Sequence, residues 1–540
     1  MKCDILIQGG QVFDGSGAQP QMIDVAIHDE RIVAMGKDLD LVASQTLDAR
    51  GLVVCPGFID IKTHSDFTLP INPKAESKVR QGVTTEIIGH CGFSVAPCLP
   101  DKVKLLADYL NPSAPWLPFK DMNFKTYVET FPQTSVNVGM LVGHNTLRLM
   151  AMGMEQREPS IMEMSHMKDM LTEGLKAGAL GMSSGLFTSP GSYAKADELK
   201  ILAEVLASHG AAYFTHLRDE SSGVLEALAE AIDIGRSSRI HVQVVHFKCS
   251  GVDNWGKTRE ALDMMDQARL EGIQIDCDAY PYTAGSNPLK NILPQWVQAG
   301  GVDAMIERLK EPQSRQKIRQ DLEKEGLNNW GRIPSWEAVR ISITPHLPEH
   351  AGKTIAELAR LQNLDPIDAL CEFLIKDKGA TRVLITSIAE SDIVALIGSE
   401  RVLVGSDGNC VADYGVVSQG MPHPRFYGTF PRVLGRYVHR EQVTSLTHAI
   451  HKMTGATARA LGFKDRGLLK LGWFGDVTMF EPEVFLDLST YEDPHRYPQG
   501  DRTTVIVNGT LVVDKAQHTG ALPGRVLRRV TSAPLHTPKH

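Results

Sequence analysis

Residues 240–278 read IHVQVVHFKCSGVDNWGKTREALDMMDQARLEGIQIDCD, and they contain one repeating unit of the fold. Short apolar runs stand at its two ends, 240–246 and 273–278, and have the length and composition of strands. Between them, residues 258–270 place apolar side chains at helical spacing. A strand, a helix and a second strand in this order predict two parallel strands joined by a crossover helix.

The same alternation continues on both sides of this stretch. Helical patterns occur at 195–207 and 224–235, and six further strand candidates lie at 58–63, 84–89, 136–142, 180–184, 211–216 and 402–406. Eight strands with helices between them predict an α/β fold of the (β/α)8 TIM-like barrel type. The alternative is an open doubly wound sheet, but no GxGxxG motif follows the first strand.

The two ends of the chain differ from the middle and resemble each other. Residues 4–12, 22–36, 474–480 and 503–513 alternate apolar and polar side chains, with Asn508-Gly509 as a hairpin turn. We therefore expect a small β-sandwich domain formed by both termini, 1–57 plus 466–540, around a barrel at 58–465. The segment between the seventh and eighth strands, about residues 285–400, is too long for one crossover. It includes charged helical sequence at 303–325, which predicts an inserted helical subdomain that covers the site.

The composition excludes several classes of protein. The 540 residues carry a net charge of −8 and are 42% hydrophobic, so neither a disordered chain nor a basic nucleic-acid binder is indicated. No apolar run approaches the roughly 20 residues that span a bilayer, and the start lacks a signal-peptide pattern. Eight cysteines without a CxxC pair indicate reduced thiols. We expect a cytoplasmic protein with no membrane or nucleic-acid partner.

Side chains that bind metals follow the predicted strands at one end. A single histidine in such a place is more often a hydrogen-bonded core residue, a single cysteine is more often packing, and Asp before Gly is usually a turn. Several together at one barrel mouth are typical of an active site with zinc or a similar ion. The residues at these strand ends are His64, His90, Cys91, His216, His246, Asp278, Tyr280 and Asp407.

Short motifs along nearly the whole chain carry a family resemblance. They are PGFID (56–60), QGVTT (81–85), CGFS (91–94), THLR (215–218), VHFK (245–248), DAYPY (278–282), GSDG (405–408), PHPR (422–425), GTFPR (428–432) and EDPH (492–495). In their order and number these motifs resemble the amidohydrolase superfamily and, within it, the D-aminoacylases, which are N-acyl-D-amino-acid deacylases.

The resemblance implies a set of site residues. Zinc would be held tightly by Cys91, His216 and His246, and Asp407 would be the catalytic acid/base. His64, with Asp407, would contribute to a weaker second metal position. The substrate carboxylate would be bound by Lys248, Tyr280 and Ser286, with Tyr193 as a further wall of the pocket.

Lys62 departs from the family pattern. The family has His-x-His after the first strand, and here the first of the two histidines is Lys62. An ammonium group with an ordinary pKa near 10.4 is a poor metal ligand. We therefore expect one tight zinc, a second position that lacks a ligand, and a Lys62 that pairs with Asp407 or lies near the substrate as a positive charge. His90 is a second departure, because Asn is common before this cysteine, and we expect it to hydrogen-bond behind the metal ligands.

The implied activity is zinc-dependent hydrolysis of N-acyl-D-amino acids to a D-amino acid and a carboxylate. Two alternatives stay open. One is another amidohydrolase that opens a cyclic amide, like a hydantoinase or dihydropyrimidinase. The other is a catalytically inactive scaffold, which the lysine at position 62 favours and the intact Cys91, His216, His246 and Asp407 oppose. The partner is expected to be a small molecule, and the sequence leaves the oligomeric state open.

Overall fold

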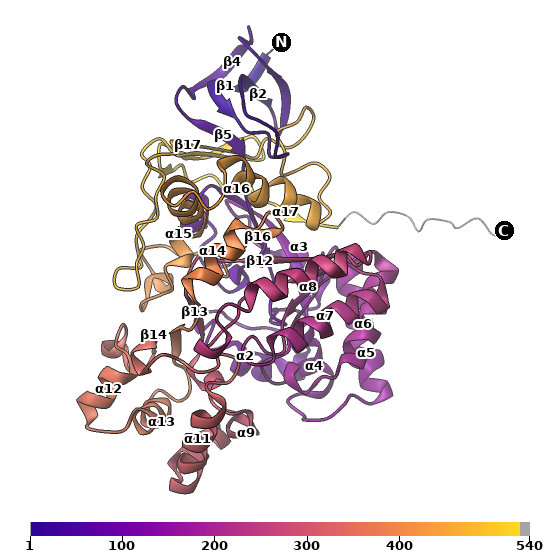
Figure 1. Ribbon diagram of the computed structural model, residues 1–540. Helices are drawn as coiled ribbons and strands as arrows, with labels where there is room; N and C mark the ends of the chain where they lie inside the picture. Colours follow the sequence, from indigo (N-terminus) through magenta and orange to yellow (C-terminus); the bar gives the residue numbers. More distant parts are fainter. Residues whose placement is uncertain (1, 530–540) are drawn as a thin grey trace, which may run out of the picture.

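The computed structural model describes residues 2–529 and has a barrel of parallel strands at its centre (Figure 1). Neighbouring strands pair in chain order, and the first and last meet through a parallel bridge between Thr63 and Gly408. The predicted (β/α)8 barrel is therefore confirmed, with each predicted strand in place. The strands are β6 (Phe58–Asp60), β7 (Val83–Ile88), β8 (Asn137–Gly143), β9 (Gly181–Gly185), β10 (Ala212–His216), β11 (Val242–Val244), β12 (Ile275–Ala279) and β16 (Val402–Val404).

Helices cover the outside of the barrel. In α7 (Val224–Ser238), Val224, Leu228 and Ala231 are buried at helical spacing, because this face packs on the strands. Helices α6 to α8 coincide with the predicted helical stretches to within a few residues. The other helices of the barrel layer are α1 (Glu76–Val79), α2 (Val103–Leu110), α3 (Phe124–Thr130), α4 (His144–Met152), α5 (Ile161–Ala177), α6 (Ala196–His209), α8 (Thr258–Leu270), α14 (Glu390–Gly398), α15 (Arg425–Arg432), α16 (Leu446–Met453) and α17 (Gly455–Ala460).

Strands from both ends of the chain form one sheet, at the top of Figure 1. β5 pairs with β17, which joins the N-terminal strands to the C-terminal ones as predicted. β1 pairs with β4 along its first half and with β5 at its end, so the sheet folds over. Its strands are β1 (Lys2–Val12), β2 (Gln21–His28), β3 (Arg31–Gly36), β4 (Val42–Asp48), β5 (Val53–Pro56), β17 (Val477–Phe480), β18 (Thr504–Val507), β19 (Thr510–Asp514) and β20 (Gln517–His518).

The predicted domain boundaries remain predictions. Residues 530–540 of the expected C-terminal segment lie outside the described residues. Just before them, β21 (Val526–Leu527) pairs with barrel strand β8, so this segment lies against the barrel. No helix in the described part of the chain combines the length and apolar character that crossing a membrane requires.

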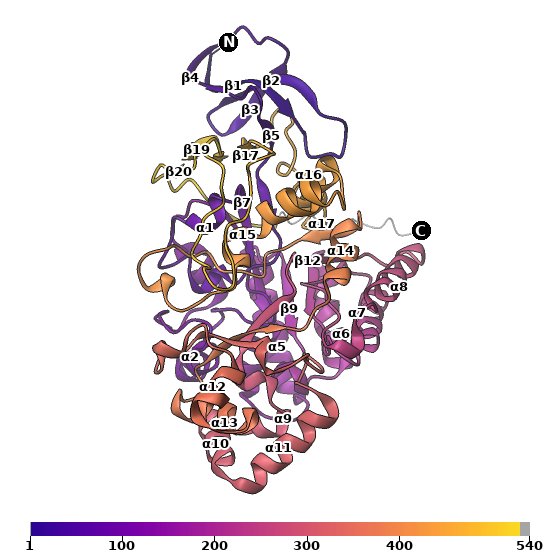
Figure 2. The ribbon, with the colours of Figure 1, turned by 60° about the vertical axis from the view of Figure 1, so that its left-hand side comes forward.

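An insertion between β12 and α14 projects from the barrel at the lower left of Figure 1 and at the bottom of Figure 2. It is not purely helical as predicted, because β13, β15 and β14 form a three-stranded antiparallel sheet. These strands have only five residues each, and the charged helical sequence between them dominates the pattern. The elements are β13 (Ala284–Pro288), α9 (Gln295–Gln298), α10 (Gly301–Lys310), α11 (Pro312–Glu325), β14 (Val339–Ile343), α12 (Ile355–Gln362), α13 (Pro366–Lys376) and β15 (Arg382–Thr386).

Candidate active site

A pocket opens at the carboxyl ends of the barrel strands. One wall comes from the barrel and carries Cys91, His216, His246 and Asp407. The opposite wall comes from the insertion and includes Ser286, Trp330 and Arg382. The insertion thus covers the barrel mouth, as the sequence predicted.

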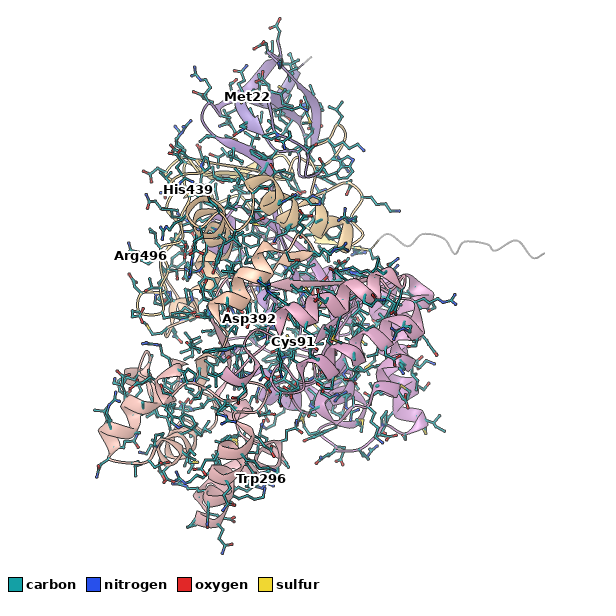
Figure 3. The ribbon with its side chains drawn as sticks, in the orientation of Figure 1. Met22, Cys91, Trp296, Asp392, His439 and Arg496 are labelled. Atoms are coloured by element: carbon teal, nitrogen blue, oxygen red, sulfur yellow. The ribbon has the colours of Figure 1, made fainter. Side chains whose placement is uncertain are left out.

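Cys91, His216 and His246 form a compact cluster, named here the metal triad. The Cys91 sulfur lies 3.5 Å from Nδ1 of His216 and 3.3 Å from Nε2 of His246. Tetrahedral zinc with ordinary Zn–S and Zn–N bonds would place sulfur and nitrogen about 3.5 Å apart. The three side chains are buried and their ligand atoms face one another, so the donor set fits zinc. Figure 3 labels Cys91 in the barrel part of the molecule, where this side chain is buried.

The backbone turns sharply at the ends of the strands that carry these residues. Cys91, His246 and Asp407 adopt left-handed conformations, with φ of 55°, 38° and 50°. Such values cost energy for residues with a side chain and are enriched at functional sites. At His246 the turn is held by Asp278, whose Oδ1 accepts the His246 backbone N–H at 2.8 Å.

Glu220 holds both histidines of the metal triad from behind. Its Oε2 lies 3.1 Å from Nε2 of His216, and its Oε1 lies 3.2 Å from Nδ1 of His246. A carboxylate in this place fixes the tautomer and the orientation of a ligating imidazole. Sequence reasoning missed Glu220, although an acidic residue four positions after a predicted ligand was a usable signal.

Charge and burial prepare the metal triad for a cation. Burial lowers the pKa of His216 and His246, so both rings are neutral as ligands must be. Burial also raises the pKa of the Cys91 thiol to about 12. Burial would raise the pKa of Glu220 as well, but the hydrogen bond from His216 and the positive charge of Lys248 keep this pKa well below the ordinary value. The thiol therefore loses its proton only when a cation replaces it.

Lys62, His64, Asp407 and Arg425 form a second group, named here the cationic cluster. The Lys62 ammonium is fully buried and pairs with Oδ1 of Asp407. It also lies 2.7 Å from Nε2 of His64, and Nη2 of Arg425 lies 2.8 Å from Oδ2 of Asp407. Burial alone would raise the pKa of Asp407, but Arg425 and Lys62 hold it well below its ordinary value.

A buried network fixes the loop that carries Asp407. Asp60 accepts the backbone N–H of Ser406 at 2.8 Å and receives the Lys78 ammonium at 2.7 Å. The same ammonium donates to the Ser406 hydroxyl at 2.6 Å. This network ties the first strand, β6, to the segment after β16. Asp60 and Lys78 therefore position Asp407, a role that the sequence analysis did not assign.

Comparisons with known proteins agree with this geometry. Residues 45–513 match the Amidohydrolase family. An N-acyl-D-glutamate deacylase from Alcaligenes xylosoxydans xylosoxydans is 35% identical over 536 residues, 98% of each chain. The chain is an amidohydrolase of the D-aminoacylase family.

Solved structures of relatives share the whole architecture of this amidohydrolase. The N-acyl-D-glutamate deacylase of Bordetella bronchiseptica, complexed with zinc and a phosphonate mimic of the tetrahedral intermediate, is 32% identical with a TM-score of 0.82. A D-aminoacylase described by one-metal activation and second-metal attenuation of its binuclear centre is 30% identical with a TM-score of 0.81. Each match covers 98% of this chain and 100% of the other.

The residues expected to bind the substrate carboxylate line the pocket of the amidohydrolase in different ways. The Tyr280 hydroxyl is buried and has no hydrogen-bond partner among the described residues. The Ser286 hydroxyl accepts from Arg382 at 3.3 Å. Lys248 is already engaged, since its ammonium donates to Glu220 at 2.7 Å and to the His246 carbonyl at 3.0 Å.

Two other expected residues lie away from the pocket surface. Tyr193 is not among the residues that line the pocket, and Phe187, Thr188 and Ser189 of the same loop line it instead. Lys62 is buried behind His64 and Asp407 and does not line the pocket either. The positive charge of Lys62 therefore acts on these neighbours and not on the pocket surface.

Arg425 also lines the amidohydrolase pocket. Its guanidinium stacks over the Tyr280 ring at 4.7 Å. Its Nε and Nη1 are buried and have no hydrogen-bond partner within residues 2–529. Buried guanidinium donors without a partner are costly, so they mark a place for a substrate acceptor.

His90 and His144 lie outside both groups. His90 is buried against the edge of Phe214, and neither ring nitrogen has a partner in the described structure. The hydrogen bond expected for this residue is therefore not seen. Nε2 of His144 lies 2.7 Å from Glu198, in a buried network away from the metal triad.

Proposed function

We propose that the protein hydrolyses N-acyl-D-amino acids to a D-amino acid and a carboxylate. The metal triad, with Asp407 across the same barrel mouth, is the observation that carries this proposal. It is supported by the N-acyl-D-glutamate deacylase that is 35% identical over 98% of the chain. The preference for D-amino acids comes from these relatives.

Cys91, His216 and His246 would hold one zinc ion. When bound, zinc polarises the amide carbonyl and makes water a stronger acid. Asp407 is ionised in the resting site, so one of its carboxylate oxygens takes a proton from the attacking water. The same oxygen then delivers that proton to the leaving nitrogen.

The substrate carboxylate would be bound at the edge of the metal triad. Tyr280 and Arg425 offer unpartnered donors there, Ser286 adds a hydroxyl, and Lys248 adds positive charge. A guanidinium presents paired N–H groups that match a carboxylate. These groups hold the substrate so that its amide faces the metal triad and Asp407.

We infer that only one metal binds. The Lys62 ammonium bonds to both His64 and Asp407, which are the groups that a second metal would need. A cation already in this place opposes a second one by charge and by occupancy. The attenuation by a second metal described for the related D-aminoacylase would then not arise in this chain.

We propose a cytoplasmic location. The eight cysteines are free and buried, and Cys91 must stay reduced to serve as a ligand. A reducing compartment protects such a thiol.

Zinc-loaded protein tested on matched N-acetyl-D- and N-acetyl-L-amino acids decides the proposal. Acetate release from the D-forms alone is the expected result. Ring opening of hydantoins without acetate release would replace the proposal with cyclic-amide hydrolysis. Absence of both bound metal and hydrolysis would favour the inactive scaffold.

A further inference from the structure

Charge is unbalanced on the pocket surface. Four cations line it, Lys248, Lys290, Arg382 and Arg425, against one carboxylate, Asp407. Two of the cations have carboxylate partners, because Lys248 pairs with Glu220 at 2.7 Å and Arg425 with Asp407 at 2.8 Å. Within residues 2–529, Arg382 and Lys290 have no carboxylate at ion-pair distance. Both residues are half-buried at the pocket, where positive charges without a counter-ion attract an anionic ligand.

Arg382 is held in place by neutral groups alone. It lies on β15, the middle strand of the insertion sheet, and donates from Nη1 to the Ser113 hydroxyl at 2.7 Å. It donates from Nη2 to the Ser286 hydroxyl at 3.3 Å. Burial, together with the charge of Arg425, lowers the pKa of Arg382 to about 10. The guanidinium is thus oriented by two serines while its charge remains uncompensated.

Two separate guanidinium groups face the pocket. Arg425 comes from the barrel and stacks on Tyr280, and its unpartnered Nε and Nη1 suit the α-carboxylate of the substrate. Arg382 comes from the insertion wall, where it donates to the Ser286 hydroxyl of the neighbouring strand. Because one carboxylate matches one guanidinium fork, a substrate with an α-carboxylate alone would leave Arg382 without an acceptor.

We propose that Arg382 binds a second carboxylate, carried by the side chain of the substrate, and that the substrates are N-acyl derivatives of D-amino dicarboxylic acids. This inference rests on the proposed deacylase function and narrows it to the N-acyl-D-glutamate and N-acyl-D-aspartate class. Relatives at similar identity include both an N-acyl-D-glutamate deacylase and a D-aminoacylase, so overall similarity does not select the side chain. The selection comes from the charges of this pocket.

Kinetics with isosteric substrate pairs test the proposal. N-acetyl-D-glutamate and N-acetyl-D-aspartate are compared with N-acetyl-D-glutamine and N-acetyl-D-asparagine, which differ from them only in side-chain charge. We expect the wild type to prefer the acids on the order of 100-fold in kcat/KM. Arg382→Met should remove this preference, mainly through KM of the acids, and leave the amides within about threefold.

A control variant shows whether the loss of preference is specific to the charge of Arg382. Lys104→Met removes a surface charge whose side chain is 86% exposed, and should change nothing. An equal loss on acids and amides in Arg382→Met, or a wild type that prefers the amides, would overturn the proposal.

Binding of the product tests Arg382 without catalysis. Calorimetry with D-glutamate and D-glutamine on zinc-loaded wild type and Arg382→Met should show a preference for D-glutamate that the variant loses. Equal binding of the two amino acids by the wild type overturns the role of Arg382, whether or not hydrolysis occurs. Hydrolysis of none of the four substrates, with D-glutamate binding intact, would overturn the proposed deacylase function and leave Arg382 as a carboxylate-binding residue.

Discussion

Lys248 and Lys62 each stand two residues from a histidine of the active site, yet they reach different sides of the imidazole rings. Lys248 lies 3.1 Å from Nδ1 of His246, on the side of Glu220, and leaves Nε2 facing Cys91. Lys62 lies 2.7 Å from Nε2 of His64 itself. The metal triad therefore keeps its nitrogens free for a metal, whereas the cationic cluster fills the corresponding place with an ammonium. The position of the lysine relative to the imidazole ring therefore decides that the metal triad, and not the cationic cluster, can bind zinc.

Removing the carboxylate of the cationic cluster should have the largest effect. Asp407→Asn cannot accept the water proton, so kcat should fall by roughly 10³-fold. The metal triad is separate from this residue, so zinc content measured by mass spectrometry should stay at one per chain. Near-normal turnover would show that Asp407 is not the acid/base. Loss of zinc would show that zinc binding by the metal triad depends on the cationic cluster.

Removing the carboxylate behind the metal triad should weaken metal binding. Glu220→Gln keeps the shape but loses the charge that orients His216 and His246, so zinc affinity should fall about 10–100-fold. Competition with a chromophoric chelator measures this change. Glu226→Gln, at an exposed position of α7, is the matched control. Unchanged affinity in Glu220→Gln would mean that the triad is oriented by its backbone alone.

Converting the cationic cluster into a metal site would remove the difference between it and the metal triad. Lys62→His restores a ligand and removes the ammonium, so zinc content in excess zinc should rise from one to two per chain. Lys62→Met removes the ammonium without adding a ligand and should stay at one. A Lys62→His protein that still binds one zinc would show that Lys62 does not limit the metal count.

The pH profile should show the smallest change. The positive charge of Lys62 lowers the pKa of Asp407, so Lys62→Met should raise that pKa. Protonated Asp407 cannot act as a base, and the acid limb of kcat/KM should therefore move to higher pH. Lys104→Met is the control, and an unmoved acid limb would mean that Arg425 alone sets the pKa.

The barrel could be predicted from sequence because its signals are local, whereas the family resemblance selected the metal triad from a larger set of residues at strand ends. Each strand is a short apolar run, and the ligands follow strand ends directly, as Cys91 follows β7. Glu220 gave only a weak local signal, since its role depends on two rings that belong to different strands. Arg382 gave no local signal, because the position of its guanidinium depends on Ser113, 269 residues earlier in the chain. The insertion sheet was missed for the same reason, since short strands are recognised by partners far away in sequence.

The closing strand pair of the barrel sets an order of events during synthesis of the chain. Asp407 and Lys62 meet at this seam although 345 residues separate them. The ligands of the metal triad have all left the ribosome once His246 has emerged, whereas Asp407 follows only after the insertion has been made. A growing chain thus contains all three zinc ligands well before it contains the catalytic base Asp407. Hydrolysis requires the last strand to close the barrel and bring Asp407 into the site, so we expect incomplete chains to be inactive.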